Sequence, residues 1–321
     1  MSPEPFSTRV ATPQWRERAE DWIGASLAEH GIEVTGGMDQ IRIRPWSTQI
    51  TVPTDRGRVW FKADCPSMSF EPALQQTIAR LVPGAVQAPI AIETDEGWML
   101  THDLGPTLGD RRTPTLQDWR HAVAEAARVQ RALVDHRDEL LATGLPHAAP
   151  ETVAERFDRL VELAEHARPD RTGALAPEVA DQVRARRSEL VDACQLLTES
   201  PVPSTWQHGD LHQGNLRDTG EGIAFFDLGD GMWSHAVEIL AVPHGVVTET
   251  GDIAWDDVAH AWCEVWEVEP GHFDELWRAS AFTHAVNRAL TWHRALLTAT
   301  AEEVVEWGDA VEHHLASMLE A

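Results

Sequence analysis

Three polar side chains fall close together in this chain, in an order that suits phosphoryl transfer. Asp210 lies in the segment His-Gly-Asp-Leu-His-Gln-Gly-Asn, Asn215 ends that segment, and Asp227 follows the apolar run 223–226. A carboxylate can orient an attacking hydroxyl, while an amide and a second carboxylate can hold Mg²⁺ on nucleotide phosphates. These residues therefore predict a catalytic role for Asp210 and a metal-binding role for Asn215 and Asp227.

Lysine is almost absent from the chain, which makes its one occurrence informative. Of the 26 Lys and Arg residues only Lys62 is a lysine, and it lies in the strand-like run Val-Trp-Phe-Lys-Ala. A lysine at such a site can hold nucleotide phosphates as a point charge. We expect Glu71, near the start of the next helix, to hold its ammonium. Asp64 shares the face of Lys62 and is the rival partner, but it is too near in sequence to link strand to helix.

The spacing of the catalytic segment is that of a kinase. His208, Asp210 and Asn215 keep the intervals of the kinase catalytic loop, and Asp227-Leu228-Gly229 stands where kinases have Asp-Phe-Gly. On these motifs the chain resembles the aminoglycoside phosphotransferase and choline kinase superfamily. This is the small-molecule branch of the protein-kinase-like fold.

The resemblance implies a bilobal α+β fold. A small β-rich lobe that binds the nucleotide would cover residues 1–103, and a larger helical lobe with the catalytic loop and acceptor pocket would cover residues 104–321. The implied activity is phosphorylation of a hydroxyl group on a small molecule by ATP or GTP with Mg²⁺. Candidate acceptors are an amino sugar, an aminoglycoside or another amine-bearing alcohol.

Several positions depart from the kinase pattern. No Gly-x-Gly-x-x-Gly joins the first two predicted strands, so backbone N–H groups and the hydroxyls of Ser47 or Thr48 are expected to cover the phosphates. The nucleobase is expected to lie against the backbone from Thr101 to Asp103. Gly209 replaces the usual arginine. The segment 234–236 lacks an aspartate that the resembled family often has there.

Periodicity and turn residues predict the elements that must position these groups. A helix over about 13–30, capped by Thr12, precedes a run of strands interrupted by one helix, and a hinge is expected at Leu104-Gly105-Pro106. The strands are predicted at 41–44, 49–53, 58–63, 90–93 and 98–102, with a helix from 71 to about 84. Helices follow at 116–143, 150–166, 177–198, 255–268, 273–297 and 302–319.

The composition indicates which partners and which cellular compartment to expect. The formal net charge of −26 argues against nucleic acid and anionic membranes as partners. No stretch of 18 apolar residues exists, and the N-terminus does not resemble a signal peptide. Three widely spaced cysteines, Cys65, Cys194 and Cys263, predict free thiols in a reducing cytoplasm. The oligomeric state is not indicated.

Two other functions compete with a kinase. His208, Asp210 and His212 alternate in a way that suits a metal-dependent hydrolase, although that function gives no role to Lys62 or Asn215. A nucleotide-binding pseudoenzyme or scaffold would keep all these polar groups without turnover. The C-terminal helices are rich in tryptophan and acidic residues, which form either an acceptor pocket or core and solvated faces.

Overall fold

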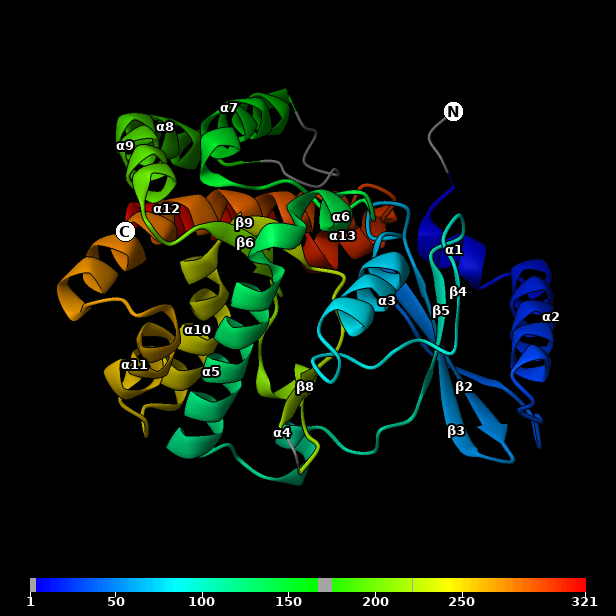
Figure 1. Ribbon diagram of the computed structural model, residues 1–321. Coiled ribbons are helices and arrows are strands. Elements are labelled where there is room, and N and C mark those ends of the chain that lie inside the picture. The colour runs from blue at the N-terminus through cyan, green and yellow to red at the C-terminus, as the bar shows by residue number, and fades with distance from the viewer. Residues whose placement is uncertain (1–3, 167–174, 221) are drawn as a thin grey trace.

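The first part of the chain forms one antiparallel sheet. The computed structural model describes residues 4–166, 175–220 and 222–321. The sheet has the order β1-β2-β3-β5-β4 and is seen almost edge-on in Figure 1. Its strands are β1 (Asp39–Ile43), β2 (Ser47–Thr54), β3 (Gly57–Asp64), β4 (Ala91–Glu93) and β5 (Trp98–His102).

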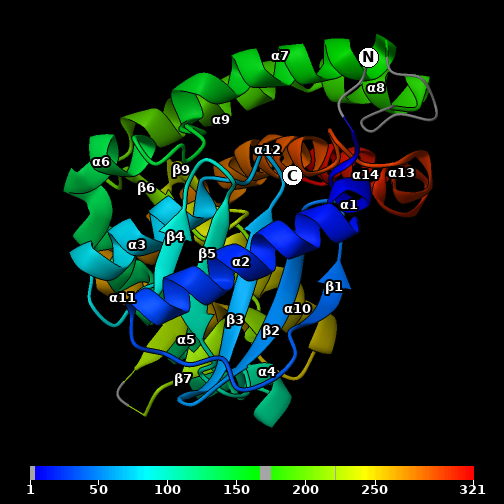
Figure 2. The same ribbon diagram turned by 90° about the vertical axis from the view of Figure 1, so that its right-hand side faces the viewer.

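Helices cover both faces of this sheet. The short helix α1 (Phe6–Val10) leads into α2 (Pro13–Glu29), which crosses the outer face of the sheet in Figure 2. Thr12 caps α2 by accepting a hydrogen bond from the Trp15 N–H. Buried apolar residues of α2 pack against alternate positions of β2, β3 and β5. Helix α3 (Glu71–Leu81) lies on the inner face, toward the rest of the molecule.

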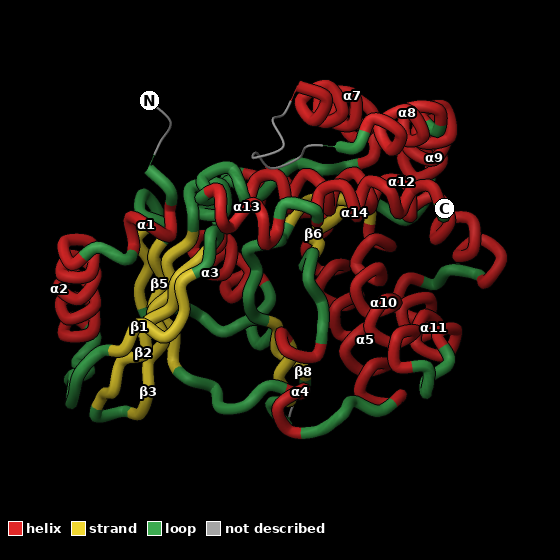
Figure 3. The backbone as a smooth tube through the Cα atoms, turned by 180° about the vertical axis from the view of Figure 1, so that it is seen from behind, coloured by secondary structure: helices red, strands yellow, loops and turns green. Residues whose placement is uncertain are grey.

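The remainder of the chain is mainly helical and packs around a long central helix, α12 (Figure 3). Its helices are α4 (Leu108–Arg111), α5 (Leu116–Leu133), α6 (Arg137–Leu141), α7 (Pro150–His166), α8 (Pro177–Ala185), α9 (Arg187–Glu199), α10 (Ala241–Thr250), α11 (Trp255–Trp266), α12 (Pro270–Ala295), α13 (Ala301–Trp307) and α14 (Ala310–Ala316).

Two small strand pairs within the helical part carry the catalytic loops. Strand β6 (Ser204–Gln207) pairs with β9 (Met232–His235), and β7 (Leu216–Asp218) pairs with β8 (Ile223–Phe225), both antiparallel. The loop with Asp210 connects β6 to β7, and the loop with Asp227 connects β8 to β9. Because the same strand pairs hold both ends of these loops, the loops are brought side by side.

The α+β architecture predicted from the sequence is confirmed, with corrections to its elements. The helices expected at 116–143, 177–198 and 302–319 are each broken, after Leu133, at Arg186 and at Gly308. Arg186 donates to the carbonyls of Met318 and Leu319, so a tertiary contact holds the break between α8 and α9. Strands β6, β7 and β9 and helices α1, α4 and α10 were not predicted, because such short segments carry little periodicity.

Cys65, Cys194 and Cys263 are buried free thiols, as predicted. Within the described ranges, no helix combines the length and the apolar character needed to span a membrane.

Candidate active site

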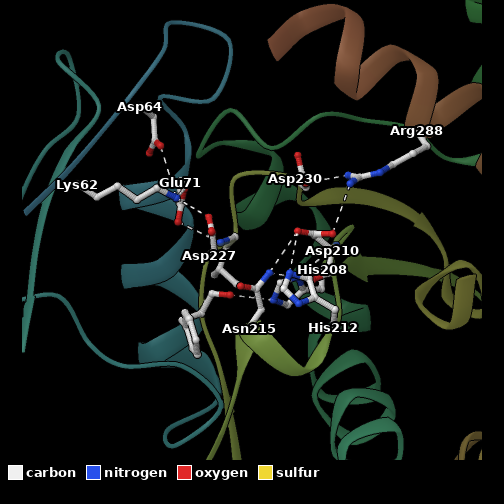
Figure 4. Close-up of polar contacts among 12 residues, drawn as sticks. Lys62, Asp64, Glu71, His208, Asp210, His212, Asn215, Asp227, Asp230 and Arg288 are labelled. Atoms are coloured by element: carbon white, nitrogen blue, oxygen red, sulfur yellow. Dashed lines mark hydrogen bonds and ion pairs between the residues drawn. The ribbon is translucent and has the colours of Figure 1, made fainter. Parts of the chain in front are cut away.

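Lys62 lies at the centre of a cluster of carboxylates. Its Nζ is 2.5 Å from Glu71 Oε2, 2.6 Å from Asp227 Oδ1 and 3.5 Å from Asp64 Oδ1 (Figure 4). Burial would lower the pKa of Lys62, but the three negative charges raise it well above its usual value. The ammonium is therefore charged at neutral pH and points into the space between the two lobes.

Glu71 links the sheet to the loop that carries Asp227. It is the first residue of α3 and is fully buried, and its Oε1 accepts the backbone N–H of Leu228 at 3.0 Å while Oε2 contacts Lys62. Its close approach also explains Gly229, where a Cβ would lie 2.9 Å from Glu71 Oε2. The predicted contact between Lys62 and Glu71 is thus present, and the same carboxylate holds the neighbouring loop.

Asp64, which the sequence offered only as a rival to Glu71, lies beside Lys62 as well. It lies two residues after Lys62 on β3 and is only 2% exposed, so the strand period brings its carboxylate to the ammonium that Glu71 also contacts. Neither Asp64 oxygen accepts a hydrogen bond from the described residues. Burial, with the charge of Glu71, raises the pKa of Asp64 well above its usual range.

Asp210 is held by three neighbouring side chains. Its Oδ1 is 3.4 Å from Arg288 Nη2, and its Oδ2 is 3.3 Å from Asn215 Nδ2 and 3.4 Å from His212 Nε2. Burial opposes ionisation, but the hydrogen bond from His212 and the charge of Arg288 lower the pKa of Asp210 to about 2. A carboxylate that is ionised at neutral pH can accept a hydrogen bond from a hydroxyl and aim it.

His208 connects the two loops instead of binding a metal. It is fully buried, its Nε2 lies 3.1 Å from the Phe226 carbonyl, and its Nδ1 accepts the Asp210 N–H at 3.3 Å. Burial lowers the pKa of His208, so the ring is neutral. Both ring nitrogens are used, and among the described residues no group of three His, Cys, Asp or Glu could hold a metal ion.

Asp227 and Asn215 carry oxygen atoms of the kind that Mg²⁺ prefers as ligands. Asp227 has a left-handed backbone, with φ of 62°, which turns its side chain toward Lys62. Burial raises its pKa, but the charge and hydrogen bond of Lys62 outweigh burial and lower it. Asn215 Nδ2 donates to the Asp210 backbone carbonyl at 2.9 Å, which leaves its amide oxygen available as a ligand. A carboxylate and an amide oxygen fit a hard cation.

The predicted phosphate-covering hydroxyls are buried. Thr48 is fully buried, and its hydroxyl donates to the Arg42 carbonyl and accepts from Gln40 Nε2, both at 2.8 Å. The Ser47 hydroxyl is also buried. The Thr48 hydroxyl is therefore used within the protein, whereas the Ser47 hydroxyl is buried without a partner among the described residues. Burial of both hydroxyls makes the backbone of the turn the better candidate for covering phosphates.

The residues predicted to line the nucleobase lie at the connection between the lobes. Thr101 is near the end of β5 and pairs with Trp60. Asp103 follows the strand, where its N–H donates to the Arg58 carbonyl and its Oδ1 accepts the Gly105 N–H. The Asp103 N–H is therefore used within the protein, which favours other backbone groups of this segment as nucleobase contacts.

A cavity of about 180 Å³ lies between the lobes, next to Asp210 and Asp227. Sequence reasoning had already named Asp64, which alternates with Lys62 on one strand, as a neighbour of the lysine. It missed other lining residues, which come from distant segments and include Trp46, Arg288 and Thr291. Arg288 is one of many arginines in the chain, and no local sequence motif marks it.

One side of this cavity is aromatic. Of the C-terminal tryptophans, Trp292 lines the cavity, and Trp307 stacks on it with ring centroids 6.1 Å apart. Trp46, from the turn between β1 and β2, meets both rings edge-on at 5.6 and 5.3 Å. The sequence left open whether the acidic residues of the C-terminal helices line an acceptor pocket or form solvated faces. None of them lines this cavity: Asp256, Asp257, Glu264, Glu267, Asp274 and Glu275.

The segment where the resembled family often has an aspartate holds a buried glutamate network instead. Ser234 lies in β9, and its hydroxyl donates to Glu238 Oε1 at 2.7 Å. Thr283 and Asn287 of α12 donate to the same carboxylate. This network fixes the end of β9 against the central helix.

The fold and this constellation together define the class of kinase-like phosphotransferases. A sequence profile of the phosphotransferase enzyme family matches residues 66–272, and the chain belongs to that family. A comparison with curated protein sequences found no match.

Several solved structures share this fold. A macrolide 2′-phosphotransferase from Brachybacterium faecium aligns with a TM-score of 0.57 at 15% identity, over 91% of this chain and 97% of that one. An ethanolamine kinase from Plasmodium vivax gives 0.61 at 12% identity, over 88% and 80% of the chains. A choline kinase from Streptococcus pneumoniae gives 0.54 at 12% identity, over 94% and 98%. At these identities the likeness establishes the fold.

Proposed function

We propose that this protein transfers the terminal phosphoryl group of ATP or GTP to a hydroxyl on a small molecule, with Mg²⁺. One observation carries the proposal. Lys62 and Glu71 come from the sheet lobe, and Asp210, Asn215 and Asp227 come from the helical lobe. Yet Lys62, Asp210 and Asp227 line one cavity, and Glu71 and Asn215 contact them from behind. Phosphoryl transfer depends mainly on positioning and charge, which this convergence supplies.

Each side chain has a role in the proposed reaction. Lys62 binds the nucleotide phosphates, and Glu71 holds its ammonium. Asp227 and Asn215 hold Mg²⁺, which when bound neutralises charge that develops on the phosphates. Asp210 accepts a hydrogen bond from the acceptor hydroxyl and aims its oxygen at the phosphorus.

The sheet lobe, residues 1–103, is proposed as the nucleotide lobe, with the base beside the backbone of Thr101 to Asp103. Residues 104–321 are proposed to hold the acceptor. The acidic surface charge and the free thiols favour a cytoplasmic protein that binds neither nucleic acid nor membranes.

The charge of the cavity favours an acceptor that bears an amine. Asp64, Asp210, Asp227 and Asp230 line the cavity, against the two cations Lys62 and Arg288. Two tryptophans, one from each lobe, form an adjacent wall, and indole faces attract ammonium groups. An amino sugar, an aminoglycoside or a simpler amino alcohol would match both features.

The test is turnover against a panel of acceptors. Purified protein with Mg²⁺ and ATP or GTP is offered aminoglycosides, amino sugars, choline and hydroxy amino acids, each beside a matched alcohol without an amine. Nucleotide consumption and phosphorylated product are followed together. We expect turnover with an amine-bearing alcohol and much less with its matched control.

Two results would replace the proposal. Tight Mg²⁺–nucleotide binding without turnover on any acceptor would indicate a pseudoenzyme. Stoichiometric zinc in the purified protein, together with hydrolysis that needs no nucleotide, would indicate the metal-dependent hydrolase.

A further inference from the structure

Arg288 brings a positive charge to the catalytic loop from a distant helix. It lies on α12, and its side chain is 9% exposed. Its Nη1 is 2.8 Å from Asp230 Oδ2 and its Nη2 is 3.4 Å from Asp210 Oδ1 (Figure 4). The guanidinium carbon lies 5.8 Å from the centre of the Trp292 ring. The side chain is therefore held between an indole and two carboxylates.

Position 209, directly before Asp210 in the catalytic loop, has no room for such a cation. Gly209, which precedes Asp210, has a left-handed φ of 78°, and a Cβ there would lie 2.0 Å from the Asp230 carbonyl oxygen. Any side chain at 209 would collide with the backbone of the second loop. The tight contact at Gly209 brings the two loops together, so position 209 cannot carry a cation beside Asp210, and the guanidinium comes from another element.

The two carboxylates that Arg288 joins would otherwise repel each other. Asp210 and Asp230 both line the cavity, and two neighbouring carboxylates disfavour each other's ionised form. A guanidinium is planar and can bond to two acceptors at once, whereas an ammonium acts as a single point. The other side chains on the Asp210 carboxylate, His212 and Asn215, contact Oδ2, so Arg288 alone among the described residues contacts Oδ1.

We infer that Arg288 is a positioning residue: by bridging Asp210 and Asp230 it fixes the direction in which the Asp210 carboxylate faces the acceptor. This inference rests on the proposed function, in which Asp210 aims the acceptor hydroxyl. It extends that function to a residue that is not among the proposed phosphate-binding or metal-binding residues. An acceptor anion is the competing partner of Arg288, but two carboxylates already occupy the guanidinium.

The first test separates positioning from binding. Arg288→Met should lower kcat about 100-fold, the scale expected when a reacting group is displaced by about 1 Å. KM for the nucleotide and for the acceptor should change little. Arg288→Lys should fall between Met and wild type, because an ammonium can hold only one of the two carboxylates well. The matched control is Arg278→Met, an exposed arginine on the same helix.

Other outcomes of this test would overturn the inference. A large rise in acceptor KM with unchanged kcat would make Arg288 a binding residue for an acceptor anion. Wild-type kcat in Arg288→Met would mean that the bridge has no effect on Asp210. If Arg288→Met does not fold, Asp230→Asn weakens the bridge from its other end and should lower kcat while leaving both KM values unchanged. If neither Arg288→Lys nor Asp230→Asn then lowers kcat, the inference is wrong.

The second test does not depend on finding the acceptor. Crystal structures of wild type and Arg288→Met should show the Asp210 carboxylate rotated away from its wild-type direction in the variant. An unmoved carboxylate would overturn the inference even if the proposed function stands. Conversely, a wild-type protein that phosphorylates no acceptor would defeat the proposed function, while a rotated Asp210 would still support the role of Arg288.

Discussion

Lys62 Nζ lies 2.6 Å from Asp227 Oδ1, so the proposed phosphate-binding and metal-binding residues neutralise each other across the two lobes. Neither group can keep this contact fully once a nucleotide and Mg²⁺ are bound, because each then has a new partner of opposite charge. Binding of the nucleotide and Mg²⁺ should therefore replace the Lys62–Asp227 ion pair by two contacts, one from Lys62 to a phosphate and one from Asp227 to Mg²⁺. Glu71 would continue to hold Lys62.

Replacing Lys62 by Arg should not preserve function, although the charge is kept. The guanidinium is broader and planar, and it would have to displace a phosphate or one of the three carboxylates around it. The measurement is nucleotide affinity and kcat of Lys62→Arg beside Lys62→Ala, and both should be strongly impaired. Full activity of Lys62→Arg would make Lys62 an ordinary charge and move the nucleotide site elsewhere.

Loss of Glu71 should produce a weaker defect than loss of Lys62, because it misplaces the lysine without removing it. Glu71→Ala combined with Lys62→Ala should be clearly less than additive, as expected for residues in contact. A double-mutant cycle on kcat/KM measures this coupling. Strict additivity would show that the pair acts independently.

Asp227→Ala should abolish the Mg²⁺ dependence of nucleotide binding, whereas Asn215→Ala should weaken it less. The carboxylate contributes charge to a hard cation, and the amide contributes only a neutral oxygen. Titrating Mg²⁺ at fixed nucleotide for each variant provides the comparison. Equal and small effects would contradict this division of roles.

Asp210→Asn should lower kcat by a factor of roughly 100 or more, the usual scale for a positioned group in proton transfer. Nucleotide affinity should hardly change, because the Lys62 cluster does not contact Asp210. The two quantities are measured separately, by steady-state turnover with the acceptor and by equilibrium binding. Near-normal turnover in this variant would rule out the catalytic assignment.

His284 should make the protein less stable in mild acid. Burial, with the charge of Arg288, lowers the pKa of His284 to about 3, whereas an unfolded histidine titrates near its usual value of about 6.5. The unfolded state therefore binds a proton that the folded state does not, and stability falls as the pH drops from about 6.5 toward about 3. The expected loss for this group is about 2 kcal/mol at pH 5 relative to pH 7.

Urea unfolding at pH 7 and pH 5 measures this effect. His284→Asn should lose less free energy of unfolding than wild type between the two pH values, and His121→Asn, an exposed position on α5, should behave like wild type. Parallel losses in all three proteins would show that His284 is not responsible.

Much of the site could be predicted from local spacing alone. Asp210 and Asn215 share one loop, and Asp227 follows a short buried strand, so their order and intervals reflect a local geometry. Lys62 and Asp64 share a face because side chains alternate along a strand. The order of strands and helices in the first lobe also follows from periodicity and turn residues, which act over a few positions.

Tertiary structure decided the contacts between distant segments. Lys62 and Asp227 are 165 residues apart and Arg288 and Asp210 are 78 apart, and no local pattern links either pair. Trp46 and Trp292 meet only because the β1–β2 turn packs on the end of α12. Breaks such as the one at Arg186 depend on carbonyls at the far end of the chain. Local propensity determines which elements form, but only the packing of those elements determines which side chains face the same cavity.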